Sequence, residues 1–138
     1  MNATRTILNE QEAAIAILLS CLHYQDRAPN KRSLSRLSYN LQQSSKFYGY
    51  SLPDIAADVM PLVNTLNQEN VLQQCSVLIS DNFRETLFAM VCEIITIDGE
   101  MSESDGEIIG LAALYLGISI ELMRVMITTF LIRNKWNA

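Results

Sequence analysis

The chain has 138 residues, a formal net charge of −5 and a hydrophobic content of 49%. This length suits one domain that buries roughly two thirds of its extended surface, and so much apolar content excludes a disordered tail. The acidic balance argues against nucleic acid as a partner. The longest apolar run, residues 13–22, is about half of what a membrane span needs. The first residues do not have the pattern of a signal peptide. We therefore expect a soluble, cytoplasmic protein.

The helices can be placed from the spacing of apolar residues, which recur every three or four positions with only five glycines and three prolines between them. This pattern is typical of an all-α protein. Start and stop signals, including capping boxes at Ser51–Asp54 and Ser102–Asp105, predict seven helices. With their capping residues, the helices are expected at about 9–24, 30–47, 51–66, 71–79, 80–94, 102–116 and 119–133.

An internal repeat relates residues 17–55 to residues 89–123. In each copy an apolar helix ends at an aspartate, and a polar loop, a capped helix, a glycine and a helix-starting serine follow. The residues in these positions are Asp26 and Asp98, Gly49 and Gly117, and Ser51 and Ser119. We expect one compact domain over residues 1–138, built as a pseudo-twofold pair of three-helix units. Repeat one spans about 10–66, a linker helix about 67–79, and repeat two about 80–134.

The second copy reads MVCEIITIDGEMSESDGEIIGLAALYLGIS from residue 90 to residue 119. Its apolar helix, Asp-Gly turn, small polar cap, acidic helix start and Leu-Gly-hydrophobic-Ser ending resemble the TerB-like family. That family comprises bacterial proteins linked to tellurite resistance and stress response, and its domain type also occurs beside a J-domain in a membrane-associated DnaJ-like co-chaperone. The resemblance implies a compact helical module without a known reaction.

The chain departs from the family pattern at several positions. Ile97 stands where the family has alanine, and Asp105 stands where glutamate is common. In the first copy the Asp-Gly pair is replaced by Asp26 and Arg27, and no matching acid follows. If the family's two loops act as a symmetric pair, this chain has kept one of them.

The acidic loop carries six carboxylates and no basic side chain between Glu93 and Glu107. One interpretation is a capped turn with solvated charges, in which Gly99 makes the turn. The other is a loose site for a hard divalent cation, with Asp98, Glu100 and Asp105 as its ligands. A regular EF-hand starting at Asp98 is excluded, because it would place Glu103 where the turn needs glycine and Ile109 where the bidentate glutamate should be.

A catalytic site has little support in the sequence. His23 is the single histidine, and Ser20 and Asp26 lie near it. A nucleophilic triad also needs an oriented base and an oxyanion pocket, which this pattern does not predict. The cysteines Cys21, Cys75 and Cys92 form no CxxC pair, so we expect buried structural thiols rather than a zinc or disulfide framework. We expect no enzyme and no cofactor, a divalent cation excepted.

A basic stretch mirrors the acidic loop. Residues 27–46 contain five basic side chains and no acid. A solvated helix face is the plainer interpretation, and binding of phosphate or anionic lipid headgroups is the alternative. Because the two charged stretches occupy equivalent positions in the repeats, we expect an electrically lopsided domain suited to a protein partner or to self-association. The interaction surface is expected at Lys31, Arg32, Arg36, Glu103 and Glu107.

These observations give two functional hypotheses. The first is a non-enzymatic TerB-like module of a bacterial stress response that acts through protein contacts, with partners that include a membrane-associated complex. The alternative is a sensor or buffer for divalent cations, which should lose stability on chelation. The last helix, apolar on nearly every face, is either the central helix of its unit or an exposed face for a homodimer.

Overall fold

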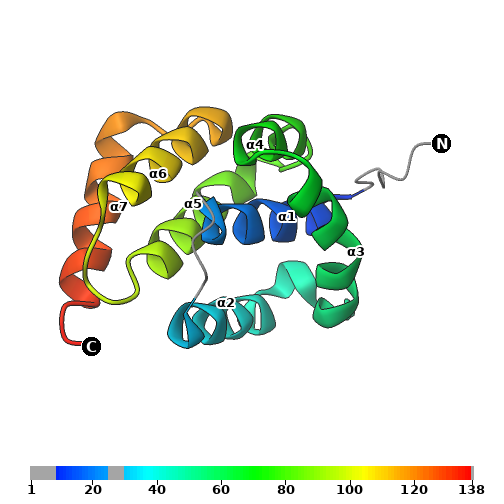
Figure 1. Cartoon of the computed structure of the whole chain (residues 1–138), viewed down its shortest axis with the longest axis horizontal. Coiled ribbons are helices and arrows are strands. Elements are labelled where there is room, and N and C mark those ends of the chain that lie inside the picture. The colour runs from blue at the N-terminus through cyan, green and yellow to red at the C-terminus, as the bar shows by residue number, and fades with distance from the viewer. Residues whose placement is uncertain (1–8, 25–29, 138) are drawn as a thin grey trace.

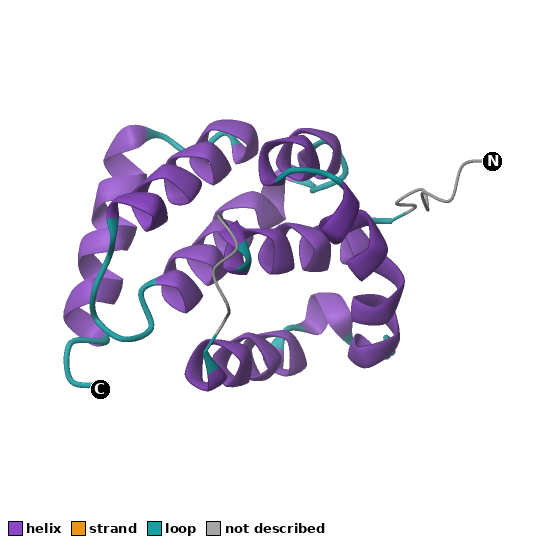
Figure 2. Cartoon of the chain, in the orientation of Figure 1, coloured by secondary structure: helices purple, strands orange, loops and turns teal. Residues whose placement is uncertain are grey.

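The computed structural model describes residues 9–24 and 30–137. Within these ranges all regular structure is helical, as expected, with seven α-helices, a short 3-10 helix and no strand (Figure 2). The elements in chain order are α1 (Glu10–Leu22), α2 (Lys31–Gln43), η2 (Ser45–Phe47), α3 (Leu52–Thr65), α4 (Gln68–Ser76), α5 (Asp81–Ile95), α6 (Glu103–Leu116) and α7 (Ile120–Arg133).

Two helices organise the core. Every residue of α1 from Glu12 to Leu22 is buried, because α3, α4 and α5 pack around it (Figure 1). Its apolar residues face all directions, so a central position is the one that removes all of them from water. The second organising helix, α5, contacts α1, α2, α6 and α7. The candidate site forms at the C-terminal end of α5, between the start of α2 and the start of α6.

Most predicted caps are confirmed. The Asn9 side chain accepts a hydrogen bond from the Glu12 N–H at 2.8 Å, and Asn30 accepts one from the Ser33 N–H at 2.7 Å. The Ser51–Asp54 capping box was a wrong prediction, since the Ser51 side chain makes no capping hydrogen bond. Pro53 in the first turn fixes the backbone there without it.

The second and the fourth helix differ from the prediction. The second helix ends at Gln43 because Ser44 is extended (φ −90°, ψ 125°), and η2 then carries Phe47 into the core. The Phe47 and Phe83 ring centroids lie 6.4 Å apart, and this contact explains why the chain leaves the α2 axis early. The fourth helix lies three residues earlier than predicted, at Gln68–Ser76 instead of about 71–79, and Asn67 caps its start.

The last helix lies at the edge of the molecule. None of its residues is buried, and it packs on α5 (Figure 1, orange to red). Of the two alternatives left open by the sequence, the structure therefore shows an exposed helix and not a central one. No helix in the described part of the chain is long and apolar enough to cross a membrane.

The three cysteines are buried, as predicted. Burial raises the pKa of the Cys75 thiol to about 11 and that of the Cys92 thiol to about 12, because the apolar surroundings disfavour the thiolate. These thiols therefore have the low reactivity of structural residues.

Candidate functional site

The acidic loop between α5 and α6 is held in place by the end of the chain. Asn134, itself buried, donates from Nδ2 to the Thr96 carbonyl oxygen at 3.2 Å, and Asn137 donates to the Ile97 carbonyl oxygen at 3.1 Å. Both acceptors lie just beyond the end of α5, in the turn where the Thr96 carbonyl oxygen also accepts from the Gly99 N–H at 2.9 Å. Gly99 makes the turn at φ +80°, as predicted.

The other end of the loop is the start of α6. Ser102 Oγ accepts from the Asp105 N–H at 3.1 Å, and an Asp105 carboxylate oxygen accepts from the Ser102 N–H at 3.0 Å. This confirms the predicted capping box. It also fixes the Asp105 side chain, which is buried against the start of the helix.

The start of α2 forms the opposite wall. Asn30 has two functions there, because its oxygen caps α2 while its Nδ2 donates to an Asp98 carboxylate oxygen at 3.0 Å. Arg32 forms an ion pair with the same carboxylate. One turn further along α2, Arg36 Nε lies 3.7 Å from a Glu93 carboxylate oxygen. Polar contacts thus connect α2 with the C-terminal part of α5 and with the loop that follows it.

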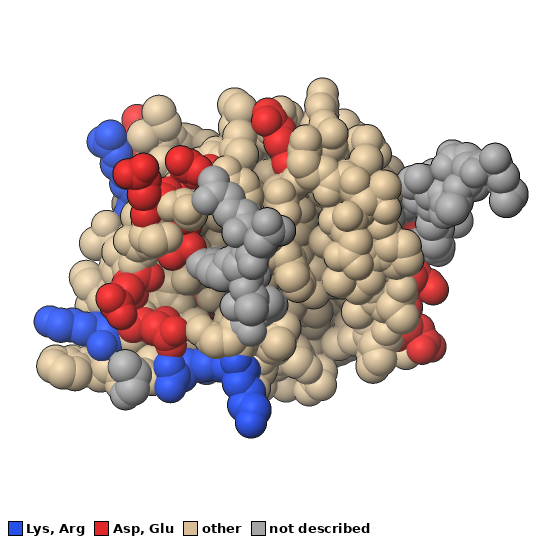
Figure 3. Space-filling view, viewed as in Figure 1, with Lys and Arg blue, Asp and Glu red and all other residues tan. Residues whose placement is uncertain are grey.

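These contacts correct the expectation of a lopsided domain. The basic residues of α2 and the acidic residues around the α5–α6 loop lie next to each other, and Figure 3 shows the blue group directly below the red one. Their charges partly cancel within the molecule. The prediction was wrong because the sequence does not show how the basic and the acidic stretch pack against each other.

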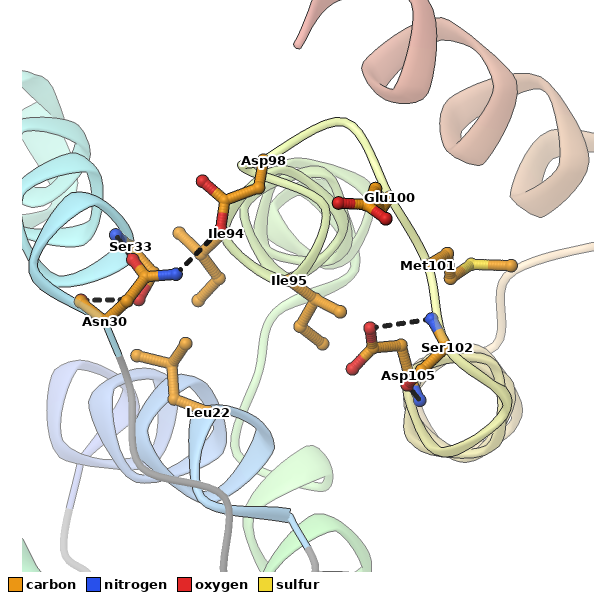
Figure 4. A pocket seen from close by; sticks show the side chains of 10 residues that line it. All are labelled: Leu22, Asn30, Ser33, Ile94, Ile95, Asp98, Glu100, Met101, Ser102 and Asp105. Atoms are coloured by element: carbon orange, nitrogen blue, oxygen red, sulfur yellow. Dashed lines mark hydrogen bonds between the residues drawn. The ribbon is translucent and has the colours of Figure 1, made fainter. Parts of the chain in front are cut away.

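A pocket of about 370 Å³ opens between these walls (Figure 4). Three apolar side chains form its floor, and three carboxylates and three small polar side chains surround it together with Met101. The lining residues are Leu22, Ile94 and Ile95, then Asp98, Glu100 and Asp105, then Asn30, Ser33 and Ser102. The pocket thus contains the three predicted cation ligands.

The three carboxylates do not converge on one point. Asp98 is turned toward Asn30 on α2, Asp105 is turned toward the Ser102 backbone, and the exposed Glu100 lies between them (Figure 4). Among the described residues, no group of three or more His, Cys, Asp or Glu side chains is placed to hold a metal ion. The cation hypothesis therefore stays a prediction, and it requires the Asp98 side chain to leave its α2 partners.

The remaining residues of the predicted interaction surface lie around this region. Lys31 and Glu103 are exposed, and Glu107 accepts a hydrogen bond from the Tyr24 hydroxyl at 3.1 Å. A second, more open hollow of about 550 Å³ lies on the outer side of Arg32 and Arg36. It is lined by Arg32, Ser35, Arg36, Tyr39, Ile97 and Asn137.

His23 lies at the C-terminal end of α1. His23 Nδ1 lies 2.7 Å from the Leu19 carbonyl oxygen, one turn back along α1. Ser20 is buried within α1, and Asp26, the third member considered for a triad, lies outside the described residues.

The sequence analysis did not identify three contacts that position the acidic loop, because the residues that make them are far from the loop in the sequence. Asn30 was predicted as a cap but not as a partner of Asp98, and neither Asn134 nor Asn137 was singled out. No local signal identifies them, because their acceptors lie 68, 38 and 40 residues away along the chain.

Comparison of the chain with protein-family models, with curated proteins and with solved structures finds no match in any of the three.

Proposed function

We propose that this chain is a non-enzymatic interaction module that binds a basic side chain of a partner protein in the pocket between α2, α5 and α6. The observation that carries the proposal is the combination of an apolar floor, Leu22, Ile94 and Ile95, with a carboxylate rim. A lysine or arginine side chain has the complementary form, an apolar stem that carries a cationic head. The negative net charge of the chain favours approach of such a group.

The rim already binds a cationic side chain of this type. The Arg32 guanidinium pairs with Asp98 from outside the pocket, so an incoming lysine would share that carboxylate or exchange with Arg32. Glu100 is exposed at the same rim and offers a second carboxylate without the loss of an intramolecular pair. We therefore expect a weak and reversible contact whose strength falls with salt.

The wider setting of this module follows from the resemblance of residues 90–119 to the TerB-like family. We propose a TerB-like domain with a pseudo-twofold arrangement, α1 to α3 against α5 to α7, that acts in a bacterial stress response such as tellurite resistance. Its partners would be cytoplasmic proteins or a membrane-associated complex. The Asp-Gly turn and the Ser102 capping box support this placement.

A titration with two short peptides tests the pocket. The first peptide contains a single central lysine between glycines, and the second replaces that lysine by norleucine, which has the stem without the charge. In amide NMR spectra we expect the lysine peptide to shift the resonances of Ile94, Glu100 and Ser102, and the norleucine peptide to shift them far less. Glu100→Gln with Asp98→Asn should abolish the difference. Equal shifts from both peptides would contradict the proposal.

The second candidate function is a sensor or buffer of divalent cations. It is favoured by one observation, that Asp98, Glu100 and Asp105 line the same pocket. Thermal unfolding with chelator and then with Ca²⁺, Mg²⁺, Mn²⁺ or Zn²⁺ tests it. A cation that binds only the folded chain adds roughly 2.7 kcal/mol at about 100 times its dissociation constant. A stabilisation that disappears in Asp98→Asn would establish the cation site, and unchanged melting with every cation would reject it.

A further inference from the structure

A second charged hollow lies beside the pocket, on the outer side of α2. It has a volume of about 550 Å³ and is lined by Arg32, Ser35, Arg36, Tyr39, Ile97 and Asn137; we call it the outer hollow. The first four of these residues are spaced three and four positions apart along α2, so they form one face of that helix. The described lining contains two arginines and no acidic residue. The outer hollow is therefore a concave surface with cationic groups of its own.

The carboxylates that pair with these arginines lie outside the outer hollow. Asp98, the partner of Arg32, lines the pocket between α2, α5 and α6. Glu93, whose carboxylate lies 3.7 Å from Arg36 Nε, lines a separate hollow between α2, α5 and α7. Each contact uses one nitrogen of a guanidinium that has five N–H donors. Because the Arg32 and Arg36 side chains are also 46% and 35% exposed, both retain donors for a further anion.

Neighbouring side chains position one of the arginines and add a donor. The Arg36 guanidinium carbon lies 5.2 Å from the centroid of the Tyr39 ring, a cation–π contact. Ser35 is exposed in the same lining, and its hydroxyl offers one O–H. Asn137 forms a wall and is not counted as a donor, because its Nδ2 already donates to two neighbouring oxygens at 3.1 and 2.9 Å. The outer hollow thus presents two guanidiniums and a hydroxyl.

From this arrangement we propose that the outer hollow binds a phosphate monoester, carried by a phosphorylated serine or threonine of a partner protein. Such a group has a charge of about −1.5 to −2 and three strong acceptor oxygens, which match two guanidiniums and a hydroxyl. A carboxylate has two oxygens and a single charge, and it offers Arg32 no more than Asp98 already does. A phosphate binds both arginines without requiring that their carboxylate partners leave.

The position of the outer hollow favours a protein as the carrier of the phosphate. Arg32 lines the outer hollow and Asp98 lines the pocket, so one ion pair separates the two sites. A partner segment with a lysine near its phosphorylated residue would occupy both. A phosphorylated lipid fits less well, because the acidic residues directly beside the arginines (Figure 3) would face the same anionic membrane. The choice of carrier rests on the proposed function, whereas the phosphate site itself does not.

Titration with three short peptides tests the phosphate site. The peptides carry a central phosphoserine, serine or glutamate between glycines and contain no lysine. In amide NMR spectra of the whole chain we expect the phosphoserine peptide to shift the resonances of Ser35, Arg36 and Tyr39, and the serine peptide to leave them unchanged. The glutamate peptide should bind at least about tenfold more weakly than the phosphoserine peptide. A phosphoserine peptide that binds no more tightly than either of the others would overturn the proposal.

Substitutions distinguish the outer hollow from a general attraction to positive charge. Arg32→Met and Arg36→Met should each raise the dissociation constant of the phosphoserine peptide at least about tenfold. Arg124→Met is the matched control, because Arg124 is an exposed arginine of α7 that does not line the outer hollow; this variant should bind like the parent chain. Thermal unfolding checks that all three variants fold. Equal losses of peptide binding in the three variants would overturn the proposal.

Asp98→Asn separates this inference from the proposed function. It weakens the competitor for Arg32, so the phosphoserine peptide should bind about two- to fivefold more tightly, whereas the lysine peptide should bind the pocket more weakly. Glu100→Gln removes one charge from the same loop but leaves the ion pair, and it should change phosphopeptide binding less. If Asp98→Asn bound the phosphoserine peptide no more tightly than Glu100→Gln did, a competing role of the ion pair would be rejected. A parent chain that binds the phosphoserine peptide but not the lysine peptide would reject the pocket and retain the phosphate site.

Flotation with vesicles that contain phosphatidic acid, a lipid phosphate monoester, gives the remaining outcome. We expect no binding of the chain to these vesicles. Vesicle binding that Arg36→Met abolishes, by a chain that does not bind the phosphoserine peptide, would assign the outer hollow to a lipid phosphate and reject a protein carrier.

Discussion

Gly99 and Asn134 approach each other so closely that a Cβ atom on Gly99 would lie 2.8 Å from the Asn134 carbonyl oxygen. The acidic loop therefore turns directly beneath the end of the chain. The Nδ2 of the same Asn134 donates to the Thr96 carbonyl oxygen, so one residue both restricts the turn and forms a hydrogen bond to it. The shape of the candidate pocket depends on this contact, because Asp98 and Glu100 flank the glycine.

The first prediction concerns this contact. Gly99→Ala should lower the free energy of unfolding by about 2 to 4 kcal/mol, because it adds a clash with backbone to the strain of a positive φ. Gly49 is the matched control, with φ +86° and no atom within 4 Å of the position that a Cβ would occupy. Gly49→Ala should cost only about 1 kcal/mol. Urea unfolding of both variants makes the comparison, and equal losses would show that the end of the chain does not restrict the turn.

The second prediction uses the two serine caps. Ser102→Ala should lower the free energy of unfolding by about 1 kcal/mol, since it removes the hydrogen bond to the Asp105 N–H. Ser51 occupies the same position in α3 but makes no capping hydrogen bond, so Ser51→Ala should change stability by less than about 0.5 kcal/mol. Thermal or urea unfolding of the two variants makes the comparison. If Ser51→Ala lost more stability than Ser102→Ala, the described cap geometry would be contradicted.

The third prediction concerns the link between α2 and the loop. The Arg32 and Asp98 side chains are 46% and 38% exposed, so a double-mutant cycle with Arg32→Met and Asp98→Asn should give a coupling energy below about 1 kcal/mol. Added salt should reduce it further. The pair of Lys46 and Glu10 is the comparison, with side chains 29% and 18% exposed. The coupling energy of Lys46 and Glu10 should be larger than that of Arg32 and Asp98. The reverse order would show that side-chain burial does not determine the coupling energy of these pairs.

The fourth prediction is a pH dependence from Glu10. Partial burial raises its pKa, but hydrogen bonds from Lys46 and Ser80 and the charge of Lys46 outweigh this, and the pKa is lowered below 4.5. The carboxylate therefore stabilises the fold above pH 4.5, and this contribution is lost as the pH falls through the lowered value.

Unfolding measured from neutral to acidic pH tests this assignment. In Glu10→Gln the loss of stability on acidification should be smaller than in the parent chain, and the two curves should converge at the acidic end. Lys46→Gln removes the main partner and should also reduce the acid-dependent loss. Parallel curves for parent and Glu10→Gln would show that Glu10 does not titrate differently in the folded and unfolded states.

Local sequence determined the helices, because caps and apolar spacing act within a few residues. Asn9, Asn30 and Ser102 start their helices as expected, Gly99 makes the predicted turn, and the all-apolar residues 13–19 lie at the centre. The acidic loop and its three carboxylates were also found from sequence, since their chemistry is visible in residue type alone.

Tertiary structure determined which of these elements pack against each other. Residues 13–22 and the last helix are both apolar on nearly every face, yet α1 is central and α7 peripheral, because burial depends on how many helices pack around each one. Arg32 and Asp98 are 66 residues apart, and only packing of α2 on α5 brings them together. The sequence by itself thus determined where helices begin and which residues carry charge, whereas only the fold decided which charges cancel and which apolar face stays open.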